Sequence, residues 1–373
     1  MKVPFIDLSR SIAPEVIDQV IEDWRDCLTH ASFVQGPRVV RFEEEVSRHL
    51  DAPPMIACGN GTDALVIALH ALGIGPGHRV ALPDLTFWAT YEAPVARGAR
   101  PVLIDVDAHF QLDLDELRAA HEEQRIDAVI LPHLFGWCSP RAREIRAFCR
   151  AEGIALIEDS AQAFGVRYEG RSIFDTDVST LSFYPAKVLG GASDGGGMFF
   201  RDVERASLAR ALSNHGRTAH YAFGRTGWSS RMSGPNAAFL SRMLARVDSM
   251  IASRRAALER YATNLASLSE PGVTLHLPPD GVEGNGYLCV LTLEDRAPDE
   301  LAAALGARGI GSARTYPSPI GAQPGAQDGF DAVTDRPRAR AFCERVLNLP
   351  LFAGITDDEV DASVDALAAA LHA

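Results

Sequence analysis

The stretch that decides the fold runs from residue 128 to residue 157 and contains two apolar runs around a helical segment. It opens with Ala128-Val129-Ile130-Leu131, continues through an amphipathic segment over residues 141–151, and closes with Ile154-Ala155-Leu156-Ile157. Continuous apolar runs, as opposed to alternating ones, are typical of strands that are covered on both faces. The stretch therefore predicts a strand, a helix and a second strand parallel to the first.

The same alternation extends in both directions, over residues 55–200. The predicted helices are Ala64–Leu72, Leu114–Glu122 and Arg141–Ala151. The predicted strands are Met55–Cys58, Arg79–Leu82, Pro101–Asp105, Ala128–Leu131, Ile154–Ile157, Thr180–Phe183 and Gly197–Phe200. This order indicates an α/β fold with a mostly parallel sheet, in which ligands bind beyond the carboxyl ends of the strands.

The pattern changes after residue 235. Residues 236–268 read as one long helix, and the remainder as a smaller α+β region. Its predicted parts are strands at Val273–Leu277 and Tyr287–Leu293, a helix at Pro298–Arg308, a loop at Pro317–Gly329 and two final helices. We expect a large domain over residues 1–240 and a smaller domain over residues 241–373, with the first residues of the chain packed on the smaller one.

Composition excludes several classes of function. The chain has 373 residues, of which 47% are hydrophobic, and a formal net charge of −13. An acidic surplus repels phosphate backbones and anionic membranes, so we expect no nucleic-acid or membrane partner. The six cysteines show no CxxC pair and no metal-ligand spacing, and the N-terminus lacks the apolar core of a signal peptide. These features predict a cytoplasmic protein with reduced thiols and no metal site.

Lysine usage points to the first chemical group. Only two of the 36 basic residues are lysines, Lys2 and Lys187. Lys187 lies in the apolar, glycine-flanked stretch Ser182-Phe183-Tyr184-Pro185-Ala186-Lys187-Val188-Leu189-Gly190-Gly191. Arginine stays charged, whereas a desolvated lysine can lose its proton and attack a carbonyl. A lone internal lysine therefore indicates a Schiff base; a surface lysine in an arginine-rich chain is the alternative.

If that carbonyl belongs to pyridoxal phosphate, a carboxylate must hold the pyridine nitrogen protonated. Asp159 follows the apolar run Ile154–Ile157, where a buried carboxylate is costly unless it meets a cation. Gln162 follows three residues later and can reach the phenolic oxygen of the cofactor. A helix cap for Asp159 and a solvated helix position for Gln162 are the alternatives.

The phosphate of such a cofactor requires a helix N-terminus. The stretch Cys58-Gly59-Asn60-Gly61-Thr62-Asp63 ends one predicted strand and begins a helix. We expect the backbone of Gly61, Thr62 and Asp63 to bind the phosphate; either the Asp63 side chain turns outward or the backbone alone binds the phosphate. The hydroxyls of Thr62 and Ser182 would add donors, and a capped helix without a ligand is the alternative.

An aromatic ring should cover the pyridine face. Phe87 and Trp88 follow a predicted strand and precede a helix, so one of them is expected to stack on the cofactor. Core packing is the alternative for this pair.

In this order, the motifs resemble those of the pyridoxal-phosphate-dependent sugar aminotransferases of the DegT/DnrJ/EryC1 family. The resemblance covers nearly the whole length and includes Pro4-Phe5-Ile6-Asp7-Leu8, Gln35-Gly36-Pro37, Leu72-Gly73-Ile74-Gly75-Pro76-Gly77, His133-Leu134-Phe135-Gly136, Glu158-Asp159-Ser160-Ala161-Gln162-Ala163, Asp194-Gly195-Gly196-Gly197 and Leu347-Asn348-Leu349-Pro350-Leu351. It implies the fold type I (aspartate-aminotransferase-like) architecture. It also implies these roles: Lys187 as the Schiff-base lysine, Asp159 as the pyridinium partner, Gln162 as a cofactor contact, Thr62 and Ser182 at the phosphate, and Phe87 before Trp88 as the stacking ring.

The sequence departs from the family pattern at four positions. Ser229 stands where the family usually has an Asn that reaches the phosphate bound by the partner subunit. We expect Ser229 to take over this cofactor contact, with a bridging water or a shift of the contact to Ser230 as alternatives. Gly234 replaces an acid that usually follows. Thr315 stands where a His usually precedes Tyr316, and a further His shortly after is also absent.

The resemblance implies a homodimer with shared active sites. We expect Arg314 and Tyr316 to contact the substrate, Arg314 through a fork for phosphate or carboxylate; a solvated loop position is the alternative for Arg314.

The resemblance implies an enzyme that moves an amino group from glutamate to a keto sugar in amino-sugar biosynthesis. A nucleotide-linked keto-deoxy sugar is the leading acceptor, and a keto-cyclitol or a sugar phosphate is the alternative. Sugar dehydratases of similar sequence replace the lysine by His, so Lys187 argues against that reaction. The presence of Lys187, Asp159 and Gln162 also argues against a binder without catalysis.

Overall fold

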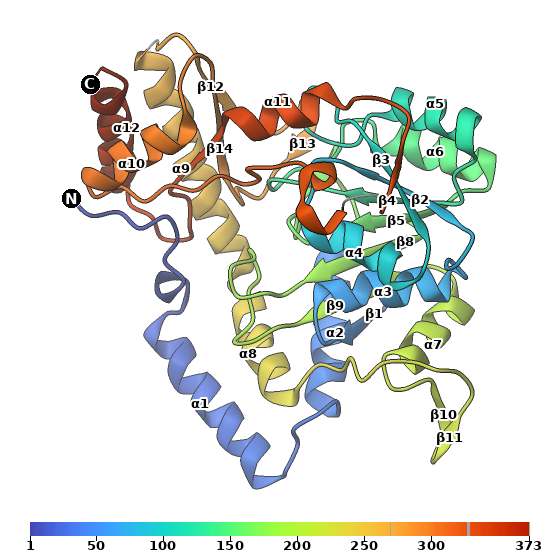
Figure 1. The fold of residues 1–373 in the computed structure, drawn as a ribbon. Helices are drawn as coiled ribbons and strands as arrows, with labels where there is room; N and C mark the ends of the chain where they lie inside the picture. The colour runs from blue at the N-terminus through green and yellow to red at the C-terminus, as the bar shows by residue number, and fades with distance from the viewer. Residues whose placement is uncertain (269, 327–328, 373) are drawn as a thin grey trace.

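The structure is a computed structural model that describes residues 1–268, 270–326 and 329–372. In the described residues, one large sheet carries helices on both faces, and smaller sheets lie around it (Figure 1). The helices are α1 (Pro14–Thr29), α2 (Pro37–Leu50), α3 (Gly61–Ala71), α4 (Trp88–Ala96), α5 (Leu114–Gln124), α6 (Ala142–Glu152), α7 (Val203–Leu212), α8 (Gly234–Leu244), α9 (Val247–Leu268), α10 (Pro298–Ala307), α11 (Pro337–Arg345) and α12 (Asp357–Leu371).

The strands of the large sheet confirm the predicted fold class. They are, in spatial order, β1 (Met55–Cys58), β9 (Gly196–Phe200), β8 (Val178–Ser182), β5 (Ala155–Asp159), β4 (Ala128–Pro132), β2 (Arg79–Pro83), β3 (Arg100–Ile104) and β15 (Asp331–Ala332). All neighbours from β8 to β15 are parallel, and β9 is antiparallel to both β8 and β1. The sheet is therefore mostly parallel, and each of the seven predicted strands overlaps one of its members.

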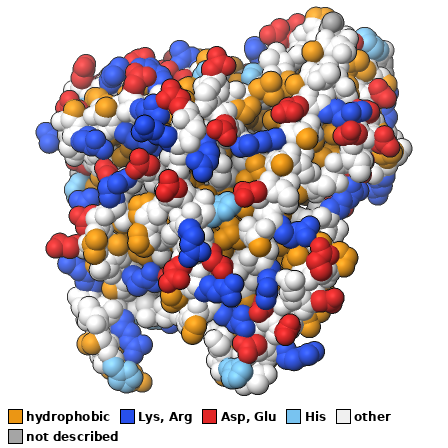
Figure 2. Space-filling model, turned by 180° about the vertical axis from the view of Figure 1, so that it is seen from behind, with side chains coloured by type: hydrophobic (Ala, Val, Ile, Leu, Met, Phe, Trp, Pro, Cys, Tyr) orange, Lys and Arg blue, Asp and Glu red, His pale blue; other side chains and the backbone are white. Residues whose placement is uncertain are grey.

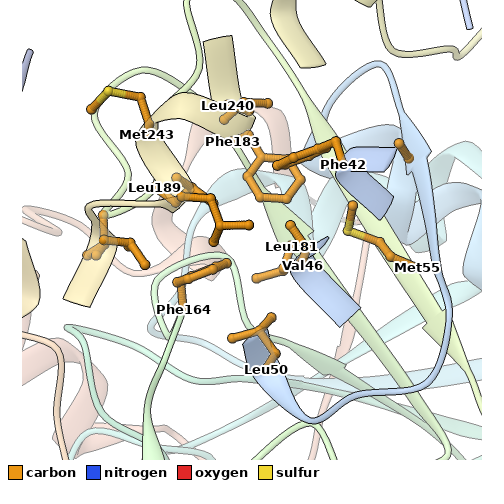
Figure 3. Close-up of a cluster of buried hydrophobic side chains, with 14 of the residues drawn as sticks. Phe42, Val46, Leu50, Met55, Phe164, Leu181, Phe183, Leu189, Leu240 and Met243 are labelled. Atoms are coloured by element: carbon orange, nitrogen blue, oxygen red, sulfur yellow. The ribbon is translucent and has the colours of Figure 1, made fainter. Parts of the chain in front are cut away.

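Alternate side chains of each strand enter different cores, because successive residues of a strand point to opposite faces. In β1, Ile56 packs with α3 and α7, whereas Met55 packs with α2 and α8. Figure 3 shows the core that contains Met55, in which the rings of Phe42 and Phe183 meet edge to face with 5.2 Å between their centroids. Burial on both faces explains why the strands read as continuous apolar runs.

The long helix predicted over residues 236–268 is wrong, because the structure has two helices there. α8 ends at Leu244 and α9 begins at Val247. No Gly or Pro marks the break. α8 packs against α1 and α2, whereas α9 packs against α12. The two helices therefore have different packing partners, which accounts for the break between them. Arg246, at the break, forms an ion pair with Glu15 of α1 at 3.0 Å.

A second packing unit follows α8. Its antiparallel sheet has the order β12 (Val273–His276), β14 (Cys289–Leu293) and β16 (Val346–Leu349), and it packs with α9, α10 and α12. β16 was not predicted. At the N-terminus, Val3 pairs with Ile310 and joins this core. The division into domains at residue 240 stays a prediction.

The remaining strands form two small sheets at the periphery. β6 (Arg167–Tyr168), β7 (Arg171–Ser172) and β13 (Val282–Glu283) form one, and the hairpin of β10 (Arg217–Ala219) and β11 (Ala222–Phe223) forms the other. Figure 1 shows the hairpin projecting from the body of the molecule. In the described part of the chain, short 3-10 helices lie at Ser9–Ser11, Ile320–Ala322 and Pro324–Ala326.

The surface carries both signs of charge. Basic and acidic side chains are intermingled on the face seen in Figure 2. Among the described helices, none combines the length and apolar character needed to cross a membrane. All six cysteines are free and buried, which is compatible with the predicted reduced thiols.

Candidate active site

The candidate site is a cavity of about 800 Å³ at the carboxyl end of the parallel strands. β5 ends at Asp159 and β8 ends at Ser182, and both residues line the cavity. The residues predicted from sequence that line it are Gly61, Thr62, Asp63, Phe87, Asp159, Gln162, Ser182, Lys187 and Tyr316. These residues come from segments far apart in the chain, and the parallel sheet brings them together.

Lys187 lies in the loop that follows β8. Its backbone N–H donates to the carbonyl of Tyr184 at 2.8 Å, which closes a tight turn. Its Nζ lies 3.5 Å from the hydroxyl of Tyr287 and 5.2 Å from the centroid of that ring. The lysine amine therefore lies in the cavity beside an aromatic ring.

Asp159 is a buried carboxylate that forms no ion pair within the described residues. Its Oδ1 accepts a hydrogen bond from the Ala161 N–H at 3.1 Å, and Thr90 Oγ1 lies 3.5 Å from its Oδ2. Burial raises the pKa of Asp159, and the Ala161 N–H and the charge of Lys187 oppose only part of this effect. A cationic N–H donor in the cavity would complete this site.

The N-terminus of α3 supplies the anion site. Asn60 caps the helix by accepting the Asp63 N–H at 2.7 Å, and the first-turn amides of Gly61 and Thr62 have no intrahelical carbonyl to bind. A Cβ at position 61 would lie 2.9 Å from Ser182 Cβ. Glycine at this position therefore lets the helix end approach the Ser182 hydroxyl, and both groups face the same part of the cavity.

The structure separates the two aromatic candidates. Phe87 lines the cavity with 56% of its surface exposed, so a flat ring could cover it. Trp88 lies outside the cavity and packs on Tyr91, with 4.8 Å between ring centroids.

Comparison with known proteins identifies the family of this chain. A family model described as the DegT/DnrJ/EryC1/StrS aminotransferase family matches residues 14–368. The chain belongs to this family. It is 33% identical to a UDP-N-acetyl-3-dehydro-alpha-D-glucosamine 3-aminotransferase of Acidithiobacillus ferrooxidans, over 99% of this chain and 98% of the relative. It is also 33% identical to a dTDP-3-amino-3,4,6-trideoxy-alpha-D-glucose transaminase of Streptomyces venezuelae, over 94% and 91% of the two chains.

Solved structures show the same fold. S. venezuelae DesV in complex with a ketimine intermediate superimposes with a TM-score of 0.93 at 32% identity, covering 99% of this chain and 98% of DesV. Ntda of Bacillus subtilis with bound cofactor PMP gives 0.90 at 26% identity, covering 100% and 86%. Family membership and these structures confirm the predicted fold type I architecture, the aminotransferase class and pyridoxal phosphate as the cofactor.

The cavity of this family member fits pyridoxal phosphate. The buried Asp159 carboxylate lacks a cationic partner in the described chain, and a protonated pyridine nitrogen would provide one. The α3 N-terminus with Ser182 would hold the phosphate, Phe87 would cover the ring, and Lys187 would carry the aldehyde carbon. These individual roles remain predictions.

Gln162 has a second function that its sequence position did not reveal. Its Oε1 accepts the Phe135 N–H at 2.6 Å, and its Nε2 donates to the Tyr316 hydroxyl at 2.6 Å. Burial raises the pKa of Tyr316 well above its usual value. Gln162 therefore fixes the position of Tyr316, and one amide hydrogen remains for a cofactor contact.

Sequence analysis missed a buried network behind the cavity. His133 lines the cavity and its Nε2 lies 2.9 Å from Glu158, which also pairs with Arg146 at 2.7 Å. Burial alone would raise the pKa of Glu158, but the hydrogen bonds from His133 and Arg146 outweigh it and lower the pKa to about 2. The adjacent acids Glu158 and Asp159 could have revealed this network. Consecutive strand residues face opposite sides of the sheet, so only one of the two acids can point into the cavity and the other needs buried partners behind it.

Two further predicted residues lie outside the cavity. Ser229 is exposed and accepts a hydrogen bond from Arg231 at 2.6 Å. Arg314 pairs with Asp299 at 2.8 Å and donates to the Cys343 carbonyl at 2.6 Å. The guanidinium of Arg314, which was expected to contact the substrate, is therefore bound by other groups of the same chain.

Proposed function

We propose that this aminotransferase takes its amino group from glutamate and delivers it to the keto group of a nucleotide-linked sugar. The observation that carries this proposal is the convergence of Lys187, Asp159 and the α3 N-terminus in one cavity, in a family whose similar members are named for UDP- and dTDP-linked sugars. The predicted place in amino-sugar biosynthesis follows from that acceptor.

Asp159, the N-terminus of α3 and Lys187 have separate roles in the proposed reaction. When bound, pyridoxal phosphate accepts the amino group and delocalises the electron pair left on the deprotonated carbon. The carboxylate of Asp159 stabilises a proton on the pyridine nitrogen, and the N-terminus of α3 binds the phosphate. The Lys187 amine, once free, would take a proton from the α-carbon of the donor and return it to the former aldehyde carbon of the cofactor, on the other side of the transferred nitrogen, acting first as general base and then as general acid.

The acceptor class can be tested in two half-reactions. Purified enzyme is treated with glutamate until the cofactor is fully aminated, and keto compounds are then added separately. We expect nucleotide-linked keto sugars to restore the original absorbance faster than simple 2-keto acids. Equal or faster reaction with 2-keto acids would refute the sugar assignment, and preference for an uncharged keto-cyclitol would support the alternative acceptor.

The attachment of the cofactor can be tested independently of the acceptor. Borohydride reduction followed by peptide mapping should place the cofactor on Lys187. Lys2 is the only other lysine of the chain and serves as the internal control. Label on another peptide would overturn the role proposed for Lys187.

We also propose that the working unit is a homodimer with shared sites. Four carboxylates line the described cavity (Asp63, Glu92, Asp159 and Asp194), whereas Lys187 is its only Lys or Arg lining residue. Carboxylate and phosphate substrates need additional cations. Arg231 is half-buried beside Ser229 and forms no ion pair within the described residues. A second copy could bring this segment to the cavity.

Mixed dimers test this arrangement. Lys187→Ala and Arg231→Ala should each be inactive as pure proteins. Mixing and reassociating the two should restore activity, because a mixed dimer contains one site with both residues intact. Arg340→Ala, which changes an exposed arginine elsewhere, is the control and should stay active. Failure of the mixture to regain activity would argue against shared sites.

A further inference from the structure

Tyr287 contacts the amine of Lys187, and no sequence motif indicated this contact. It precedes β14, is half-buried, and lines the cavity. Its hydroxyl lies 3.5 Å from the Lys187 amine, measured between Oη and Nζ. That distance is long for a hydrogen bond, and the ring face at 5.2 Å adds an attraction for the ammonium form.

The backbone around Tyr287 is tightly constrained. Asn285 donates from Nδ2 to the carbonyls of Gln162 and Phe164 at 2.9 and 3.0 Å, and its own N–H donates to the Gly136 carbonyl at 2.8 Å. The segment is therefore anchored to the cofactor side of the cavity before it reaches Tyr287.

Two glycines make this close approach possible. A Cβ on Gly136 would lie 2.7 Å from the Tyr287 nitrogen, and a Cβ on Gly286 would lie 2.7 Å from Arg254 Cβ. Gly286 also has a φ of +67°, which favours glycine. Such packing holds the Tyr287 ring in one place, as expected of a side chain that orients another group.

We propose that Tyr287 is a positioning residue for the Lys187 amine. Its hydroxyl and ring direct the free amine toward the aldehyde carbon of the cofactor, and later toward the carbon from which the proton is removed. This inference rests on the proposed attachment of the cofactor to Lys187. Tyr287 itself changes no bond in either step.

The step to be measured is capture of the aldehyde by the cofactor-free protein. The Lys187 nitrogen forms a bond to the aldehyde carbon, and the aldehyde oxygen leaves as water with both protons of the neutral amine. Stopped-flow absorbance gives the rate of this capture. The affinity for pyridoxine 5'-phosphate, an alcohol that cannot form the imine, reports the rest of the site separately.

Tyr287→Phe removes the hydroxyl and keeps the ring. We expect capture to slow about tenfold, because one directing contact is lost, while affinity for pyridoxine 5'-phosphate stays within about twofold. Tyr287→Leu also removes the ring and should be slower still. Tyr168→Phe is the matched control, since Tyr168 lies outside the cavity and carries Arg143 over its ring at 4.9 Å; its capture rate should equal that of wild type.

The outcomes separate this inference from the proposed function. An unchanged capture rate in Tyr287→Phe would overturn the role of Tyr287, although Lys187 would keep its own. A parallel loss of pyridoxine 5'-phosphate affinity would show that Tyr287 only maintains the shape of the cavity, which also overturns the proposal. No imine in wild type would overturn the attachment at Lys187 instead.

Discussion

Two consecutive acids of β5, Glu158 and Asp159, lie on opposite faces of the strand, and their pKa values are shifted in opposite directions. Glu158 is fully buried and accepts hydrogen bonds from His133, Arg146 and Thr176, so its pKa falls to about 2. Asp159 is also buried, but it points into the cavity without an ion-pair partner in the described chain, and burial raises its pKa. A carboxylate that the fold satisfies stabilises structure, whereas one that the fold leaves unsatisfied indicates a ligand.

Asp159→Asn should have the largest effect on activity and little effect on folding. The amide cannot stabilise a protonated pyridine nitrogen, so transamination should fall by roughly 10²- to 10³-fold. The cofactor-free variant should be at least as stable as wild type, because a buried and unpaired carboxylate is removed. Half-reaction kinetics and urea denaturation measure the two quantities. Wild-type turnover in this variant would show that Asp159 is only a cap for the Ala161 amide.

Glu158→Gln should show the reverse pattern. The substitution leaves the guanidinium of Arg146 without its buried partner, so the free energy of unfolding should drop by about 3 kcal/mol. The glutamate half-reaction should change less than in Asp159→Asn. Urea denaturation of both variants makes the comparison, and a stability equal to wild type would mean that the Glu158 network contributes little net energy.

The two acids should also respond differently to pH. Because its folded pKa is depressed, Glu158 contributes stability above its ordinary value of 4.5 and loses that contribution as the pH falls toward about 2. Asp159 has a raised folded pKa, so in cofactor-free protein it favours the fold below its ordinary value of 3.8 and loses this effect as the pH rises.

Unfolding curves of cofactor-free wild type, Glu158→Gln and Asp159→Asn measure this difference. The gap between wild type and Glu158→Gln should close between pH 4.5 and about 2. The gap for Asp159→Asn should have the opposite sign and close below pH 3.8. Gaps that are constant with pH would contradict the assigned ionisation states.

Thr176→Val should have the smallest effect of the set. It removes the hydroxyl that donates to Glu158 Oε1 and leaves the bonds from His133 and Arg146 in place. Loss of one hydrogen bond to a charged group should cost about 1.5 kcal/mol of stability. Thermal denaturation measures the loss, and the KM for glutamate is the control, which should not change because Thr176 does not line the cavity.

The sequence by itself determined the large sheet and the family. Strands buried on both faces are mostly apolar along their length, so local composition identified seven of the eight described strands of this sheet and missed only the two-residue strand β15. The stretch around Lys187 and the carboxylate at the end of β5 were also visible in the sequence. An unusual lysine and an acid at the end of an apolar run differ from their neighbours, and this can be seen without knowing any tertiary contact. The strand β16 escaped prediction because its pairing with β14 is not local.

Tertiary structure alone decided several other features. It divided residues 236–268 into two helices with different packing partners, and it placed Phe87 in the cavity and Trp88 outside it. It also brought Tyr287 to Lys187 across a hundred residues of chain. Sequence pattern reports which face of an element is apolar, but the partner that covers this face is set by the whole fold. The same limit applies to Glu158 and Asp159, whose different roles depend on which cations the fold brings near each of them.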